Sequence, residues 1–286
     1  MIRQDQAFYD TAKRFDLLPM SPPSTSVEAS QPLFHLILPT SNYTMKMFDH
    51  SCVTCNLREV VQWRSIESIF HHHPLAKAIV HSNALLQSDF AVLTEAGYSI
   101  EVQRYDLLKL LEDTPARSLA DAVKAPYFHE SERDLLKIVI LYMFGGIYMD
   151  TDIILVRPVG SIGTDVVTWQ GPRNMTLSKS FMKFSKRSRY LKAYLERIDI
   201  MLYSNRSLDI FIEMFSDSFQ DIQILSNLAF HTFNTIDDTK QNYNYQQTAY
   251  GVQLCSQEKH DFVRLEEGIP FKHVLNSYCV LCNKLY

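Results

Sequence analysis

The strongest constraint on the fold is an apolar run in the middle of the chain, residues 131–158, which carries two aspartates in its second half. Ser131 can cap a helix, and Asp134 can complete a capping box three residues later. The residues that follow are apolar on most sides, so the sequence predicts a helix buried in a domain core. The pair Gly145-Gly146 ends this helix, because glycine takes the left-handed conformation without strain.

The segment 147–156 is typical of a buried strand, except that Asp150, Thr151 and Asp152 interrupt it. Residues i and i+2 of a strand share a face, so both carboxylates are predicted to point the same way. Burying two like charges is costly unless something compensates them, and a divalent cation does so. Mn²⁺ and Mg²⁺ prefer oxygen ligands, often one or two carboxylates together with substrate phosphates. Asp150 and Asp152 are therefore candidate metal ligands for chemistry on a diphosphate.

Upstream of this run, strand-like and helix-like patterns alternate. A short apolar run, a segment with helical spacing and a second apolar run form a predicted parallel βαβ unit, and a second helix and strand follow. The length of 286 residues suits one large α/β domain. The predicted strands are 33–38, 78–80 and 99–102, and the predicted helices are 57–70 and 90–96.

Composition excludes some classes of function. The formal net charge of -4 gives no electrostatic reason to expect nucleic acid as a partner. No segment reaches the roughly 18 unbroken apolar residues that span a bilayer. Residues 1–31 include the linker-like stretch 21–26, and we interpret them as a flexible tail or stem. The chain is expected to be soluble, or to be the lumenal part of a protein whose membrane anchor lies outside this sequence.

The cysteines leave three states open: a structural zinc site, disulfides, or free buried thiols. Three Asn-x-Ser/Thr sequons lean toward a secretory lumen, where such asparagines are glycosylated. The five cysteines are Cys52, Cys55, Cys255, Cys279 and Cys282, and the sequons start at Asn42, Asn174 and Asn205.

The central run resembles the sugar-binding region of glycosyltransferase family 32. That family includes α-1,4-galactosyltransferases of the globotriaosylceramide synthase type. The residues that carry the resemblance are Asp134-Leu-Leu-Lys137, Leu141-Tyr142 and Gly145-Gly146-Ile147-Tyr148-Met149-Asp150-Thr151-Asp152. The likeness extends over about residues 33–160 and is thin afterwards.

The resemblance implies a GT-A type fold, which is α/β with a Rossmann-like, mixed but mostly parallel sheet flanked by helices in a single domain. Residues 32–160 would form the nucleotide-sugar-binding half with the DXD motif, and residues 161–286 the acceptor-binding half. The implied reaction is a Mn²⁺-dependent (or Mg²⁺-dependent) retaining transfer of a hexose from a nucleotide sugar, with a UDP-sugar as the expected donor. The implied acceptor is a glycan or glycolipid, and the implied location is the Golgi or secretory lumen, with the cytoplasm as the alternative.

The resemblance also assigns site residues. Asp134 matches a residue that contacts the donor sugar, and Lys137 stands where the family usually has arginine. Asp150 matches a residue near the ribose and sugar, and Asp152 the metal ligand. The predicted donor-binding residues are Asp134, Lys137, Gly146, Tyr148 and Asp150, the predicted metal ligands are Asp152 and Asp150, and no catalytic nucleophile is assigned.

Several of these residues have plainer interpretations, and the chain departs from the family pattern. Asp134 could only cap its helix, Lys137 could be a solvated partner one turn away, and Tyr148 could be a core residue. Arg133 stands where a small residue is usual, and Ser178-Lys179 replaces an Asn-Gly pair before a predicted strand at 181–184. The alternative function is therefore a degenerate, non-catalytic protein that still binds a nucleotide sugar.

Overall fold

The computed structural model describes residues 31–38, 57–124, 129–170, 176–203, 221–232, 249–254, 274–275 and 277–281. The predictions for residues 1–30, for four of the five cysteines and for the three sequons lie outside these ranges.

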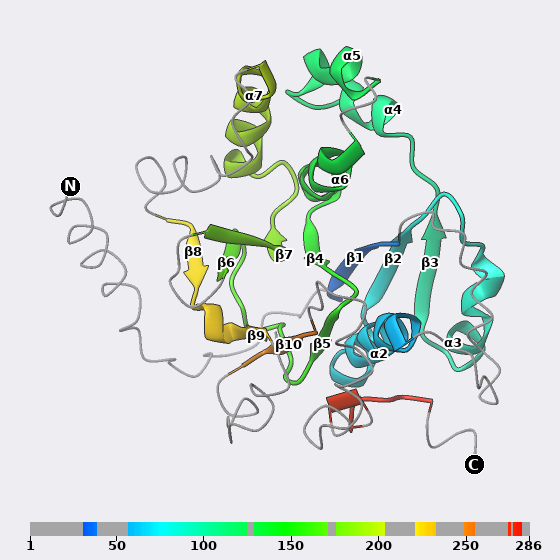
Figure 1. The fold of residues 1–286 in the computed structure, drawn as a ribbon. Coiled ribbons are helices and arrows are strands. Elements are labelled where there is room, and N and C mark those ends of the chain that lie inside the picture. Colours follow the sequence, from blue (N-terminus) through cyan, green and yellow to red (C-terminus); the bar gives the residue numbers. More distant parts are fainter. Residues whose placement is uncertain are drawn as a thin grey trace, which may run out of the picture.

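A seven-stranded sheet forms the centre of the molecule, with strand order β3-β2-β1-β4-β7-β6-β8 (Figure 1). β1 pairs in parallel with β2 and β4, β2 pairs in parallel with β3, and β6 pairs in parallel with β8. β7 runs antiparallel to both β4 and β6. The strands are β1 Leu33–Ile37, β2 Lys77–His81, β3 Ser99–Gln103, β4 Gly146–Met149, β6 Val166–Gln170, β7 Thr176–Phe184 and β8 Gln223–Leu225. The predicted mixed, mostly parallel sheet is confirmed.

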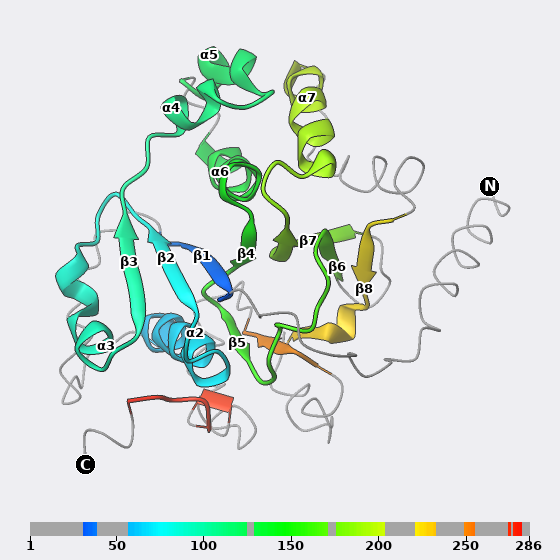
Figure 2. The same ribbon diagram turned by 180° about the vertical axis from the view of Figure 1, so that it is seen from behind.

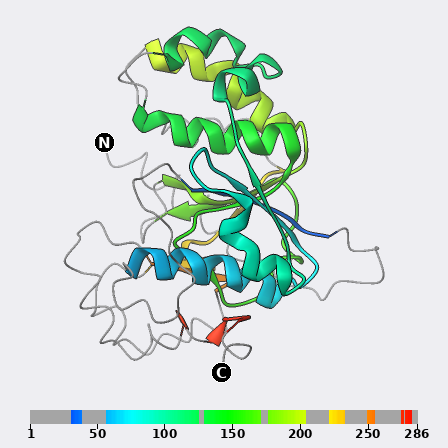
Figure 3. The same ribbon diagram turned by 90° about the vertical axis from the view of Figure 1, so that its right-hand side faces the viewer.

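Helices cover both faces of this sheet, and Figure 3 shows the layers from the side. α4 to α7 lie over one face, and α2 and α3 lie over the other. The helices are α2 Leu57–His72, α3 Ala91–Glu95, α4 Leu107–Glu112, α5 Ala120–Val123, α6 His129–Phe144 and α7 Arg189–Tyr203, with 3₁₀ turns η1 Gln87–Phe90, η2 Arg117–Leu119 and η4 Asn227–Ala229. None of the helices within the described ranges is long and apolar enough to cross a membrane.

The alternation of side chains along β4 divides the core. Ile147 and Met149 pack in the cluster that includes α2, whereas Tyr148 packs in the cluster that includes α6 and α7. Successive residues of a strand point to opposite faces, so this four-residue strand contributes to both cores.

The Gly145-Gly146 pair joins α6 to β4 where only glycine fits. The φ angles are +70° at Gly145 and +95° at Gly146, in the region that other residues rarely adopt. A Cβ on Gly145 would lie 2.6 Å from the backbone nitrogen of Lys186, and one on Gly146 would lie 2.6 Å from the carbonyl oxygen of Leu33. The predicted end of the helix is confirmed, but the predicted capping box is wrong, because α6 already begins at His129 and Ser131 lies inside its first turn.

The predicted continuous strand over 147–156 is also wrong. β4 ends at Met149, and β5, Ile153–Leu155, belongs to a second, three-stranded sheet with the order β5-β10-β9. The backbone N–H of Asp150 donates to the Ser180 carbonyl at 2.7 Å, and that of Ile153 donates to the Asp150 carbonyl at 3.1 Å. The aspartates therefore lie in a turn where the chain leaves one sheet and enters another.

The second sheet lies beside α2, as Figures 1 and 2 show from opposite sides. Its residues Ile154 and Val252 also pack with Val274 and Leu275 of the C-terminal segment, which comprises residues 274–275 and 277–281. β5 pairs antiparallel with β10, Gly251–Gln253, which pairs in parallel with β9, Phe230–Thr232. The Leu155 N–H donates to Ser68 Oγ at 2.9 Å, and the Leu155 carbonyl accepts from His72 Nε2 at 3.2 Å.

The C-terminal segment is held on α2 by a buried carboxylate. The Leu281 N–H donates to Glu67 Oε1 at 3.1 Å, and Arg64 pairs with the same carboxylate. Arg64 also contacts Cys279, which is disulfide-bonded. A disulfide was one of the three states that the sequence left open.

Two histidines are buried together between β1 and β2. His35 Nε2 donates to the Gly145 carbonyl oxygen at 2.9 Å, and His35 Nδ1 lies 3.0 Å from His81 Nε2. When both rings are neutral, the proton of His35 is on Nε2, so His35 Nδ1 accepts from His81 Nε2. Burial lowers the pKa of His35 to about 4, although the Gly145 carbonyl opposes the shift. Burial and the neighbouring His35 lower the pKa of His81 to about 3.

This pair predicts acid sensitivity. The unfolded chain takes up protons near the ordinary histidine pKa of about 6.5, whereas the folded chain does not. The contribution of the two histidines to the free energy of unfolding is therefore fully present above about pH 6.5 and falls as the pH drops toward 4. Each histidine contributes up to about 1.4 kcal/mol per pH unit in this window. Urea unfolding of wild type and of His81→Gln, whose amide can still donate to His35 but does not titrate, should show a shallower pH dependence in the variant. Equal slopes would contradict the assignment.

Candidate functional site

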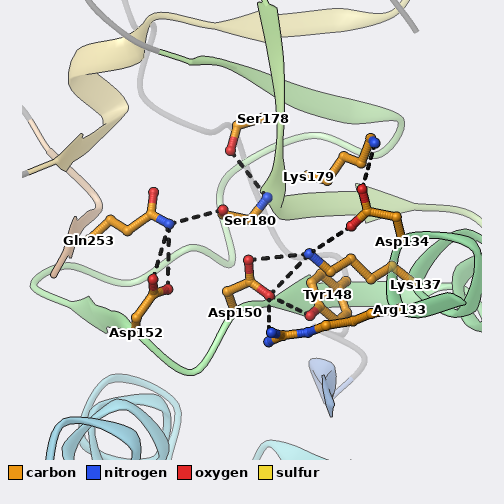
Figure 4. A network of polar contacts seen from close by, with 10 residues as sticks. All are labelled: Arg133, Asp134, Lys137, Tyr148, Asp150, Asp152, Ser178, Lys179, Ser180 and Gln253. Atoms are coloured by element: carbon orange, nitrogen blue, oxygen red, sulfur yellow. Dashed lines mark hydrogen bonds and ion pairs between the residues drawn. The ribbon is translucent and has the colours of Figure 1, made fainter. Parts of the chain in front are cut away.

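The Asp150–Asp152 turn lies at the carboxyl end of β4, where four elements converge on it (Figure 4). α6, β4, β7 and β10 supply the side chains around it. They are Arg133, Asp134 and Lys137 from α6, Tyr148 from β4, Ser178, Lys179 and Ser180 from β7, and Gln253 from β10.

Asp150 points toward α6 and has three partners, two on α6 and one on β4. The Tyr148 hydroxyl donates to Asp150 Oδ1 at 2.5 Å, and Lys137 Nζ lies 3.2 Å from the same oxygen. Arg133 Nη2 lies 3.4 Å from it. The charge of Asp150 is therefore compensated by two cations of the protein itself.

Asp134 is the second carboxylate on this side. Lys179 Nζ donates to its Oδ2 at 2.7 Å, and Lys137 Nζ lies 3.4 Å from its Oδ1. Burial raises the pKa of Asp134, but the charges of Lys137 and Lys179 outweigh burial and lower that pKa overall. Asp134 is thus an ionised member of a network of ion pairs, and its role is more than helix capping.

Lys137 is the centre of this network. Its side chain is buried and lies between Asp134 and Asp150, so the interpretation of it as a solvated helix residue is wrong. Its ammonium group also lies 5.1 Å from the centre of the Tyr148 ring, within the range of a cation–π contact.

Tyr148 joins the core to the site. The side chain is fully buried, as the core interpretation predicts, yet its hydroxyl reaches Asp150. Burial, together with the Asp150 charge, raises the pKa of Tyr148 well above its ordinary value. The phenol therefore stays protonated and donates to the carboxylate.

Asp152 faces the opposite direction, toward β10. Gln253 Nε2 lies 3.3 and 3.4 Å from its two oxygens and 3.0 Å from Ser180 Oγ, and the Leu254 N–H donates to the Asp152 carbonyl at 2.9 Å. Burial and the neighbouring Asp150 raise the pKa of Asp152 to about 6, against the bond from Gln253. Among the described residues Asp152 forms no ion pair, so it is the carboxylate of the turn that a cation would stabilise most.

The structure brings four of the predicted residues, Asp134, Lys137, Tyr148 and Asp150, into one network and places Asp152 beside it. The two carboxylates do not point the same way, because Asp150 and Asp152 lie in a turn. Gly146 lies at the start of β4, where its missing Cβ admits the backbone of β1. A donor contact at Gly146 stays a prediction.

Sequence reasoning missed three residues that complete the site. Lys179 and Ser180 lie on β7, whose strand was predicted only from residue 181, and Gln253 lies on the three-residue strand β10. For β7, the available signal was that Ser178-Lys179 replaces the Asn-Gly pair usual in the family at this position. A short segment such as Gly251–Gln253 carries no periodicity that could have revealed Gln253.

Comparison with known families identifies the central region. Residues 60–169 match the family described as "Glycosyltransferase sugar-binding region containing DXD motif". The resemblance to DXD glycosyltransferases is therefore confirmed for this stretch, which contains α6, β4 and the Asp150–Asp152 turn.

Individual relatives support the same resemblance at low identity. The human lactosylceramide 4-alpha-galactosyltransferase is 28% identical over 185 residues, which cover 61% of this chain and 47% of that protein. The human alpha-1,4-N-acetylglucosaminyltransferase is 41% identical over 58 residues, 19% of this chain and 17% of that protein. The chain spans about half the length, or less, of the curated relatives it matches.

Among solved structures, the apo-form glycosyltransferase GlyE of Streptococcus pneumoniae superposes with a TM-score of 0.49 and 10% identity, covering 87% of this chain and 63% of that one. The PaToxG glycosyltransferase gives 0.45 and 15%, covering 65% and 67%.

The buried network predicts unequal costs for two lysine substitutions. Lys137→Met removes the cation shared by Asp134 and Asp150 and should lower the free energy of unfolding by about 3 kcal/mol, as for a broken buried pair. Lys192→Met, which breaks only the exposed pair with Glu196, should cost at most about 0.5 kcal/mol. Urea denaturation at pH 7 measures both, and equal stabilities would show that the network contributes nothing.

Proposed function

We propose that this chain is a divalent-metal-dependent glycosyltransferase that transfers a hexose from a nucleotide sugar to a glycan or glycolipid. The observation that carries the proposal is that the two aspartates of the DXD turn differ in charge compensation. Asp150 is neutralised by Lys137 and Arg133, whereas Asp152 is half-buried beside a neutral amide. We take a UDP-sugar as the donor on the resemblance alone.

The residues of the turn fit a hard divalent cation. Asp152, with Asp150 next to it, would hold Mn²⁺ or Mg²⁺. Burial and the Asp150 charge raise the pKa of Asp152, and a bound cation would offset both effects. When bound, such a cation supplies charge that stabilises the diphosphate leaving group. The described part of the chain contains no cluster of three or more His, Cys, Asp or Glu side chains suited to a metal. The donor phosphates and water would therefore complete the coordination.

The chain's own residues would orient the donor. Asp134 is an ionised acceptor, so it can bind sugar hydroxyl groups, and Lys137 fixes it relative to Asp150. Tyr148 holds Asp150 from inside the core, so this carboxylate needs no rearrangement when the donor arrives. The retaining outcome rests on the family resemblance.

The two predicted halves share this work. We assign residues 32–160 to donor binding and residues 161–286 to the acceptor, with one amendment. Three residues of the second half lie at the proposed donor-binding site: Lys179, Ser180 and Gln253. The second half would therefore contribute to donor binding as well as to acceptor binding. The disulfide at Cys279 supports an oxidising compartment, as expected for a transferase of the Golgi or secretory lumen.

One observation favours a second candidate, a protein that binds nucleotide sugars without turnover. Asp134, the residue that the resemblance assigns to the donor sugar, is in a 2.7 Å ion pair with Lys179. A donor hydroxyl would have to compete with this ammonium group. UDP release from a panel of nucleotide sugars with Mn²⁺ separates the two candidates, since only the enzyme releases UDP.

Metal binding should depend on nucleotide. Because the described residues offer two carboxylates and no further cluster, Mn²⁺ alone should bind weakly, and Mn²⁺ with UDP or GDP should bind at least about tenfold more tightly. Calorimetric titration of Mn²⁺ with and without nucleotide measures this difference. The same affinity in both titrations would remove the diphosphate from the site.

Asp152→Asn should separate turnover from folding. The substitution keeps the shape of the side chain and removes the charge that the cation needs, so donor turnover should fall at least about a hundredfold. Circular dichroism should be unchanged, because the half-buried Asp152 carboxylate is not stabilised by an ion pair among the described residues. Asp121→Asn, an exposed aspartate paired with Lys124 on α5, is the matched control and should keep full turnover. Full activity in Asp152→Asn would exclude a metal role for this residue.

A further inference from the structure

Arg133 is the cation of the site that faces solvent. Its side chain is 38% exposed, compared with 7% for Lys137 and 16% for Lys179. Arg133 and Lys137 are four residues apart on α6, so they lie on one face of the helix. A ligand that approaches Asp150 from solvent therefore meets the Arg133 guanidinium group before it meets the two lysines.

Arg133 interacts with the Tyr148 hydroxyl, but its closest ion pair is longer than those of Lys137 and Lys179. Arg133 Nη2 lies 3.4 Å from Asp150 Oδ1, beyond the roughly 2.7–2.9 Å of a strong charge-assisted bond. The same oxygen already accepts from the Tyr148 hydroxyl at 2.5 Å and faces Lys137 Nζ at 3.2 Å. Arg133 is thus a third donor to an oxygen with two lone pairs. Its buried Nε has no hydrogen-bond partner within the described part of the chain.

The ion pairs around Arg133 are unevenly distributed. Arg133, Lys137 and Lys179 form ion pairs with two carboxylates, Asp134 and Asp150, whereas Asp152 turns to β10 and acts on Arg133 only through its charge, without an ion pair. Asp134 and Asp150 are compensated by the two lysines, which are the better buried cations. Among the three cations the guanidinium group has the longest closest ion pair, and its Nε has no hydrogen-bond partner within the described part of the chain, so an anionic ligand group would complete its hydrogen bonds.

We propose that Arg133 binds an anionic oxygen of the donor. The inference rests on the proposed function and adds to it a residue that selects the donor by charge. Two sources have the required chemistry: the diphosphate, and a carboxylate on the donor sugar, as in a hexuronic acid. Both present paired oxygens that match the planar fork of guanidinium.

The test is calorimetric binding with Mn²⁺ of UDP, UDP-glucose and UDP-glucuronate to wild type, Arg133→Gln and Arg133→Lys. Arg117→Gln, an exposed arginine on η2 outside the network, is the matched control and should bind as wild type does. Arg133→Gln should weaken binding of the recognised group about 10- to 100-fold, the usual loss for a hydrogen bond between charged partners. Arg133→Lys keeps the charge but loses the fork, so it should lie between. Thermal unfolding of each variant identifies any loss due to folding, and the lysine variant carries the test if the glutamine variant is unfolded.

The pattern of losses identifies the source of the oxygen. If Arg133→Gln weakens UDP and both sugars alike, the guanidinium binds the diphosphate. If it weakens only UDP-glucuronate, the guanidinium binds the sugar carboxylate. Either pattern supports the proposal. Unchanged affinity for all three ligands in folded Arg133→Gln would overturn it while leaving the proposed function intact, whereas a wild type that binds none of them would overturn the proposed function as well.

Discussion

The site depends on the need to compensate partly buried charges near the end of β4. Asp134 and Asp150 come from different elements, and Lys137 lies between them. A carboxylate that loses its solvation is stable only with a partner, so α6 must hold Lys137 against β4, and β7 must bring Lys179 to Asp134. The same ion pairs that make the burial tolerable therefore fix α6, β4 and β7 relative to one another.

The backbone around Gly145 and Gly146 makes that arrangement possible. Both residues have positive φ, and the chain passes within van der Waals contact of β1 and of Lys186 at this point. α6 consequently folds back over the strand that follows it. Its polar residues, Arg133, Asp134 and Lys137, then lie above the carboxyl end of β4, which is the edge of a sheet where ligands of α/β proteins bind.

Much of this could be predicted from the sequence because it is local. The βαβ alternation, the buried helix and its glycine stop follow from periodicity and from the conformational preferences of glycine, and the structure confirms them. Whether the segment 147–156 forms one strand or two depends on the strands with which its two ends pair. Ser180 pairs with Asp150, and Gln253 pairs with Ile153, over separations that no local pattern encodes. The residues missed at the site, Lys179 and Gln253, were missed for the same reason.

The Asp150–Asp152 turn is also the seam between the two sheets. Asp150 is fixed to the large sheet by its backbone bond to β7, and Asp152 is fixed to the small sheet by its backbone bond from Leu254. The spacing of the two carboxylates is thus set by how the two sheets are joined. The small sheet is held on α2 by the bond from Leu155 to Ser68, and α2 in turn holds the segment with the disulfide-bonded Cys279 through Glu67. The positions of the two aspartates therefore depend in part on residues far away in the sequence, around Glu67 and Cys279.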